Sequence, residues 1–247
     1  METKEIVVEL AEKEMAFRLH FAGTEVPFLY YGARKAEKKY NKYTEAKLKI
    51  VLKFQEDKKC SESFAEFSTL LAEAGDNLLH EERMLFHGVG MIYKERGYIL
   101  TAPSGTGKST QFSNFKKLYG NGCRIINGDK PVVRHMAGNV YRIYPSPWNG
   151  KENWGGKEDA ALKAIIWLEQ GVENRIKKCA ASDMVLPLLK QVIYSAPDSE
   201  TVHEACLMLD GILSNIPIYR FVNTGELDSS KMLGDFLDSE VEKEVEI

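Results

Sequence analysis

The sequence lacks several features that would assign it to a class at once. Its four cysteines lie far apart and form no C-x-x-C pair, which argues against a zinc site and a disulfide framework. Neither charge sign dominates, with 33 Lys and Arg against 36 Asp and Glu, so no nucleic-acid partner is indicated. We find no signal-peptide pattern and no apolar run that approaches a membrane span. We therefore expect a cytoplasmic protein that binds neither nucleic acid nor membrane.

Residues 1–80 are predicted to form a small α+β unit. A helix is expected over Phe64–Ala74, because apolar residues recur there at helical spacing. The polar stretch Glu56–Ser63 is expected to be a loop. Period-two alternation and β-branched content predict strands at Ile6–Leu10, Met15–Phe21, Phe28–Tyr31 and Ala46–Phe54.

Residues 84–247 are predicted to form the larger part of the protein, an α+β (α/β) core with a mixed sheet. A strand pair, Met84–Tyr93 and Tyr98–Thr101, leads into a glycine-rich segment. The further expected strands are Cys123–Asn127, Pro131–His135, Val140–Tyr144, Leu162–Leu168 and Ile218–Val222. The expected helices are Gln111–Leu118, Met184–Tyr194, Val202–Leu213 and Lys231–Leu237, and an acidic stretch follows at Asp238–Glu246.

The glycine-rich segment matches most of the phosphate-binding pattern G-x-x-x-x-G-K-[ST], although Ala102 replaces its first glycine. Gly105 and Gly107 can adopt backbone angles that turn successive N–H groups inward around an anion. Lys108 can reach the outer phosphates, and the Ser109 hydroxyl can bind Mg²⁺. We therefore expect ATP with Mg²⁺ as ligand. The predicted nucleotide-binding residues are Ser104, Gly105, Thr106, Gly107, Lys108, Ser109 and Thr110.

A carboxylate that could complete the metal site follows the next buried strand. Phosphate-binding loops need an acidic residue for the metal, usually at the end of a neighbouring strand. Asp129 stands at the end of Arg124–Asp129 and is predicted to bind Mg²⁺ together with Ser109. The other interpretation of this segment is an Asn-Gly-Asp surface turn.

The order of three motifs resembles the superfamily of HPr kinases and ATP-dependent phosphoenolpyruvate carboxykinases, and within it HPr serine kinase-like proteins. The motifs are His87-Gly88-Val89, the loop ending at Thr110 and the strand ending at Asp129, with further similarity at Pro147–Lys151. The resemblance covers roughly Met84–Val222. It implies a carboxykinase-like phosphate-loop core and transfer of the γ-phosphoryl group of ATP to a hydroxyl, on a protein serine or on a small molecule. HPr kinases assemble, so the resemblance is also compatible with a homo-oligomer.

One position departs from the family's pattern. HPr kinases carry two adjacent aspartates at the end of the metal strand, whereas this chain has Gly128 before Asp129. Either Asp129 serves as both metal ligand and base, or His87 accepts the proton, or transfer is slow or absent. His87 could instead be a structural residue. The alternative function is accordingly an ATP-binding regulatory module with little or no phosphoryl transfer.

A tryptophan-rich stretch, Trp148–Lys157, is the remaining candidate for a substrate contact. Its glycines and lysines indicate a mobile loop that closes over phosphates or acceptor, with Lys151 neutralising charge and Trp148 forming a wall. The alternative is a solvent loop whose tryptophans are anchored in the core.

Overall fold

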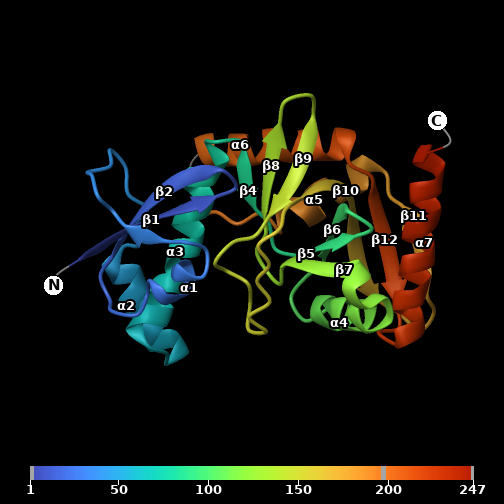
Figure 1. The fold of residues 1–247 in the computed structure, drawn as a ribbon, viewed down its shortest axis with the longest axis horizontal. Coiled ribbons are helices and arrows are strands. Elements are labelled where there is room, and N and C mark those ends of the chain that lie inside the picture. The colour runs from blue at the N-terminus through green and yellow to red at the C-terminus, as the bar shows by residue number, and fades with distance from the viewer. Residues whose placement is uncertain (1–2, 196–198, 246–247) are drawn as a thin grey trace.

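The computed structural model describes residues 3–195 and 199–245 of the chain (Figure 1). The first elements form a sheet of three strands in the order β2-β1-β3 with three helices beside it. Their bounds are β1 (Lys4–Leu10), β2 (Lys13–Leu19), α1 (Val26–Leu29), β3 (Arg34–Lys35), α2 (Leu48–Lys58) and α3 (Glu62–Leu79). The predicted strands Ile6–Leu10 and Met15–Phe21 and the predicted helix Phe64–Ala74 correspond to β1, β2 and α3.

Two predicted strands and a predicted loop in this region are wrong. Phe28–Tyr31 lies in and directly after the short helix α1, which has a proline in its first turn. Ala46–Phe54 belongs mostly to helix α2, where Val51 is fully buried while Leu48 and Leu52 are exposed. The alternation of lysine with apolar residues therefore did not mark a buried strand face. Helix α2 also continues into Glu56–Ser63 as far as Lys58.

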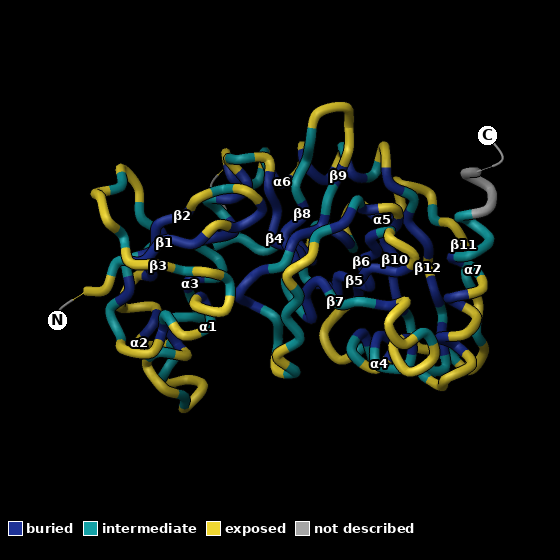
Figure 2. Tube along the Cα trace, in the orientation of Figure 1, coloured by how far each residue is buried: buried dark blue, intermediate teal, exposed yellow. Residues whose placement is uncertain are grey.

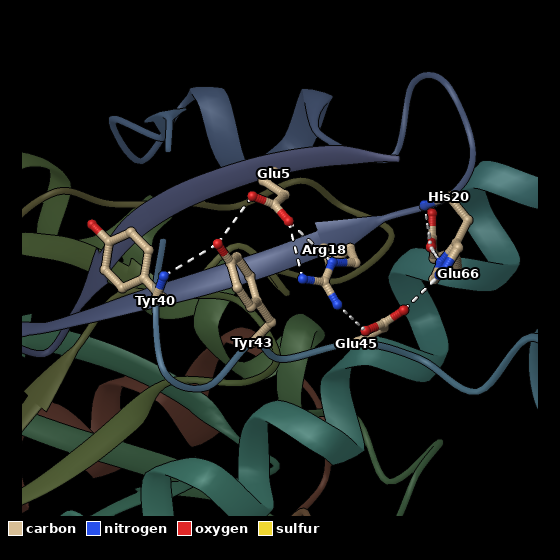
Figure 3. A network of polar contacts seen from close by, with 7 residues as sticks. All are labelled: Glu5, Arg18, His20, Tyr40, Tyr43, Glu45 and Glu66. Carbon is tan, nitrogen blue, oxygen red and sulfur yellow. Dashed lines mark hydrogen bonds and ion pairs between the residues drawn. The ribbon is translucent and has the colours of Figure 1, made fainter. Parts of the chain in front are cut away.

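Figure 3 shows a polar network that ties the first sheet to α3. Arg18 on β2 bridges Glu5 on β1 and Glu45, at 3.0 and 3.1 Å. His20 lies between Glu45 and Glu66, with each ring nitrogen 3.0 Å from a carboxylate oxygen. The Glu66 side chain is fully buried on α3 and also accepts a hydrogen bond from the backbone N–H of His20. Because buried charges are stable only when paired, this network fixes the position of α3 against the sheet.

The second sheet has nine strands and is mixed, as the sequence predicts. Seven strands follow the order β4-β8-β9-β10-β6-β5-β7, and β12 pairs with both β10 and β11. β10 runs parallel to β6 and β12, whereas β5, β7, β8 and β9 form antiparallel pairs. Their bounds are β4 (Arg83–Leu85), β5 (Val89–Tyr93), β6 (Arg96–Thr101), β7 (Cys123–Asn127), β8 (Val132–Met136), β9 (Val140–Tyr144), β10 (Ala160–Gln170), β11 (Arg175–Lys178) and β12 (Ile218–Asn223).

Helices cover both faces of this sheet, and Figure 1 places α4 and α6 on opposite sides of it. Ile99 and Ile165 belong to one core with residues of α5 and α6. Their chain neighbours Leu100 and Ile166 belong to a second core with residues of α4 and α7. This alternation explains why Tyr98–Thr101 of β6 and Ala164–Leu168 of β10 are buried on both faces (Figure 2). The helices are α4 (Lys108–Tyr119), α5 (Ala181–Leu189), α6 (Ser199–Asn215) and α7 (Leu227–Val245).

Several boundaries of the larger part differ from the prediction. The expected strand Met84–Tyr93 is two strands, since β4 pairs with β8 and β5 pairs with β6 and β7. The break falls at Gly88, where an added Cβ would lie 2.8 Å from a side-chain carbon of Ile99. The last helix, α7, is longer than predicted and takes up the acidic stretch as far as Val245. β11 was not predicted.

A bilayer-spanning helix is not found among residues 3–195 and 199–245. The division of the chain at about residue 80 stays a prediction.

Candidate functional site

The glycine-rich segment forms a tight turn between β6 and α4. Gly105 and Gly107 have φ angles of +82° and +104°, in the left-handed region that favours glycine. No atom outside the turn lies within 4 Å of a Cβ built at either glycine, so both face open space. The Thr106 hydroxyl donates to the carbonyl of Pro103 at 2.9 Å and holds the turn. Helix α4 begins directly at Lys108, and an anion at this turn would meet the positive end of the helix dipole.

Lys108 curls back over this turn. Its ammonium donates to the carbonyl oxygens of Ala102 and Pro103, at 2.9 and 3.3 Å, and the residue is only 8% exposed. Burial lowers the pKa of Lys108, and the charge of Asp129 opposes that shift. The amine is thus held beside the glycines. An anionic ligand bound there would stabilise the charged ammonium and offset the cost of its burial.

Asp129 stands in a turn that directly follows β7. The side-chain oxygen of Asn127, a fully buried residue, accepts from the backbone N–H groups of Asp129 and Lys130 at 2.9 and 2.7 Å. The Asp129 carboxylate lies 2.8 Å from Nζ of Lys130. The chain therefore forms the Asn-Gly-Asp turn that was the other interpretation of this segment. The turn holds the Asp129 carboxylate beside Lys130.

His87 lies in the connection between β4 and β5 and faces Asp129. Its Nδ1 is 2.9 Å from Oε1 of Gln191, and its Nε2 is 3.5 Å from Oδ1 of Asp129. Burial lowers the pKa of His87 to about 4, and the charges of Lys130 and Lys108 act in the same direction. With a pKa of about 4 the ring is neutral at pH 7. The near-neutral pKa that would favour His87 as the proton acceptor is not present in the free protein.

These groups line one cavity of about 510 Å³. The predicted residues that it brings together are His87, Ser104, Gly105, Gly107, Lys108, Ser109, Thr110, Asp129 and Lys151. Of the predicted nucleotide-binding residues, Thr106 does not line it. Gly128, Gly150 and Glu152 line it as well and were not predicted as site residues. Most of the lining is polar or charged, which suits a phosphate-bearing ligand.

Glu152 is the acid that sequence reasoning missed. A Cβ built at Gly150 would lie 2.9 Å from Cβ of Asp129 and 3.6 Å from Oε2 of Glu152, so the two acids flank the same glycine. The Glu152 side chain is 24% exposed, while that of the neighbouring Lys151 is 90% exposed. No motif marks Glu152 in the sequence. Its position depends on how the loop folds back on β7.

Trp148, the predicted wall of the acceptor site, does not line this cavity. It is 4% exposed and stacks on Phe67 of α3, with ring centroids 5.6 Å apart at 17°. Its indole N–H donates to the carbonyl of Phe67 at 2.9 Å. At the other end of the loop, Trp154 packs on Phe112 of α4 at 5.2 Å. Both tryptophans are thus anchored in the cores, as the alternative interpretation of this stretch holds.

Gly128 is required by the close approach of this loop. Its N–H donates to the carbonyl of Trp154 at 2.8 Å. A Cβ at Gly128 would lie 2.8 Å from the carbonyl oxygen of Asn149 and 2.9 Å from Cβ of Trp154. The second aspartate of the HPr kinase pattern therefore does not fit at this position without moving the loop.

We expect Gly128→Asp to lower the free energy of unfolding by about 1–3 kcal/mol, the usual effect of overpacking, and to bring no gain in phosphoryl transfer. Chemical denaturation measures the stability. Gly122→Asp is the matched control, because nothing lies within 4 Å of a Cβ at Gly122. A Gly128→Asp protein of unchanged stability and higher transfer rate would contradict this packing argument.

The donor set of the cavity fits magnesium better than a metal held by many side chains. Within the described ranges, no group of three or more His, Cys, Asp and Glu residues is placed to hold a metal ion. The cavity offers two carboxylates, Asp129 and Glu152, and the hydroxyl of Ser109. Mg²⁺ usually keeps several waters and takes only one or two carboxylates together with phosphate oxygens.

The chain therefore combines a mixed α+β fold with a cavity of glycines, lysine, histidine and acids. No family model matches the chain, and no curated protein matches it. Among solved structures, the Hpr(Ser) kinase/phosphatase from Coxiella burnetii is similar over 65% of this chain and 98% of that chain. The two sequences are 9% identical and the TM-score is 0.38.

Proposed function

We propose that the protein is an ATP- and Mg²⁺-dependent phosphotransferase that acts on a hydroxyl group. One observation supports this most strongly. A turn that requires glycine at two positions, at the start of a helix, shares a cavity with Lys108 and with the acids Asp129 and Glu152. Anion-binding backbone, a mobile cation and metal-binding acids are the parts that phosphoryl transfer needs.

The proposal assigns roles to several residues of the cavity. The turn at Gly105 and Gly107 binds phosphate oxygens, and Lys108 brings positive charge to them. Ser109, Asp129 and Glu152 would hold Mg²⁺, which when bound would neutralise phosphate charge. Lys151 extends from the loop into solvent at the rim and would meet the outer phosphates or the acceptor.

The transfer itself conserves atoms and charge. The acceptor oxygen forms a bond to the γ-phosphorus, the bond from that phosphorus to the bridging oxygen breaks, and ADP leaves. The hydroxyl proton passes to Asp129, or to Nε2 of His87, which faces Asp129 at 3.5 Å. The pKa of about 4 makes His87 a weak base in the free protein. Bound phosphates would raise that pKa, because nearby negative charge favours the protonated ring.

The second candidate is a regulatory module that binds ATP without transferring phosphate. Gly128, where the resemblance leads us to expect an acid, favours it. Glu152 weighs against it, because it brings a second carboxylate to the cavity from the loop.

ATP with Mg²⁺ is expected to raise the melting temperature of the protein. At a ligand concentration of about 100 Kd the stabilisation is about 2.7 kcal/mol, which corresponds to about 5–10 °C for a chain of this size. AMP lacks the outer phosphates and should give a much smaller shift at the same concentration. An equal shift with AMP, or none with ATP, would overturn the proposal. Transfer of label from γ-labelled ATP to a hydroxyl acceptor then separates the phosphotransferase from the regulatory module.

A further inference from the structure

We propose that Lys130 is an internal counter-ion, which neutralises Asp129 in the free protein and keeps Mg²⁺ from binding there before the nucleotide does. This inference rests on the proposed function for the presence of metal and ATP. It gives a role to a residue that does not line the phosphate cavity. Because Lys130 acts through Asp129, it is a positioning residue and not a catalytic one.

Lys130 is paired with the carboxylate that the proposed function assigns to the metal. Its Nζ lies 2.8 Å from Oδ1 of Asp129, and its side chain is only 13% exposed. Nε2 of His87 lies 3.5 Å from the same oxygen. Within residues 3–195 and 199–245, no other carboxylate lies within ion-pair distance of the Lys130 ammonium. Asp129 is therefore its one anionic partner in the described part of the chain.

Hydrogen bonds on both sides fix the backbone of Lys130. Its N–H donates to Oδ1 of Asn127 at 2.7 Å, and its carbonyl accepts from the hydroxyl of Ser146 at 2.5 Å. Pro131 follows it, and a residue before proline is restricted to extended backbone angles. Lys130 therefore cannot follow a displaced partner by a movement of the turn, and only its side chain can adjust.

A metal ion that binds Asp129 in the free protein would have to compete with this ion pair. The Lys130 ammonium would then stay mostly buried beside a divalent cation, without an anionic partner. Removing one partner from a buried ion pair is costly, because the remaining charge is left uncompensated. We therefore expect the free protein to bind Mg²⁺ weakly.

Bound phosphates would offset this cost, because the charge of Lys130 extends to the cavity. Burial is the main cause of the lowered pKa of Lys108 and of His87, and the charge of Lys130 acts in the same direction on both. Both residues line the cavity, so phosphates bound there would interact with Lys130 as well. The ammonium would gain anionic partners as Asp129 binds the metal. Nucleotide and metal should then favour each other's binding.

A shortage of ligands is the other cause that weak metal binding can have. The cavity offers only the carboxylates of Asp129 and Glu152 and the hydroxyl of Ser109. If the shortage alone limits binding, removal of Lys130 leaves the affinity for metal unchanged. If Lys130 competes with the metal, its removal raises that affinity. A variant of Lys130 therefore distinguishes the two causes.

The test measures the binding of Mn²⁺, a paramagnetic substitute for Mg²⁺, to the full chain without nucleotide. The electron paramagnetic resonance signal of free Mn²⁺ gives the dissociation constant. Lys130→Met removes the ammonium and should bind Mn²⁺ at least about tenfold more tightly than the parent protein, because a positive charge beside the site is lost. Lys130→Arg keeps the charge and should bind as weakly as the parent. Asp129→Asn, added to Lys130→Met, should abolish the gain.

The melting temperature gives a second measurement. In the parent protein, MgCl₂ should raise it only when ATP is present. In Lys130→Met, MgCl₂ alone should raise it. Lys130→Gln serves for both measurements if the methionine variant does not fold, which circular dichroism shows.

Lys117→Met is the matched control, because Lys117 is an exposed lysine of α4 and should leave Mn²⁺ binding unaltered. Equal affinity of Lys130→Met and the parent protein would overturn the inference. A gain that survives Asp129→Asn would overturn it too, since the metal would then bind elsewhere. Tighter Mn²⁺ binding by Lys130→Met, in a protein that ATP does not stabilise, would instead refute the proposed function and leave Lys130 as the counter-ion of Asp129.

Discussion

Replacing Lys108 with alanine is expected to lower the rate of phosphoryl transfer from ATP about 10²–10³-fold, the usual effect of losing one preorganised electrostatic contact. The ammonium already lies beside the glycine turn, 2.9 Å from the carbonyl of Ala102, so it needs little movement to meet a phosphate. The measurement is the initial rate with γ-labelled ATP and a labelled acceptor. The ATP-dependent rise in melting temperature should shrink in the same protein.

Lys117→Ala provides the comparison, because Lys117 is an exposed lysine of the same helix. It should leave both measurements unchanged. Circular dichroism and the melting temperature without ligand show whether each variant is folded. A folded Lys108→Ala protein with full transfer would exclude this cavity as the site of reaction.

Replacing Asp129 with asparagine is expected to lower the rate of transfer about 10²–10⁴-fold, the range for loss of a general base. Asparagine keeps the size of the side chain, so the turn built on Asn127 should persist. The rate is measured at several Mg²⁺ concentrations. If the acid also holds the metal, the variant should need more Mg²⁺ than the parent protein.

Glu152→Gln distinguishes metal binding from proton transfer. We expect it to shift the Mg²⁺ requirement with a smaller effect on the rate at saturating metal, because the proposal gives Glu152 no part in proton transfer. Asp57→Asn, at an exposed acid of α2, serves as the neutral control. Full transfer by Asp129→Asn at every metal concentration would remove Asp129 from the mechanism.

The parts of the site that are local in sequence could be predicted, and the parts made by long-range packing could not. The turn at Gly105 and Gly107 was predicted because spacing within a few residues determines its backbone, and Asp129 was predicted because it ends a buried strand. Glu152 enters the cavity only because the loop is anchored through Trp148 and Trp154 to different cores. Nothing near Glu152 in the sequence encodes that anchoring.

The same distinction between local and long-range information explains the errors in the predicted fold. Strands and helices that bury a periodic apolar face were found with boundaries wrong by a few residues. The helix at Ala46–Phe54 was not predicted. Lysine alternates there with apolar residues as in a strand, and only one apolar residue of α2 is fully buried. Tertiary contacts to α3 decide the structure of that segment, and a local pattern does not contain them.

The strip of chain around Gly150 has a thermodynamic consequence. It lines the phosphate cavity on one side and, on the other, a hollow between α1, α3 and the loop that follows Pro147. A ligand that shifts this strip changes the free energy of the opposite site, and such coupling is reciprocal. The factor by which a ligand of that hollow alters the dissociation constant of ATP must therefore equal the factor by which ATP alters the dissociation constant of that ligand.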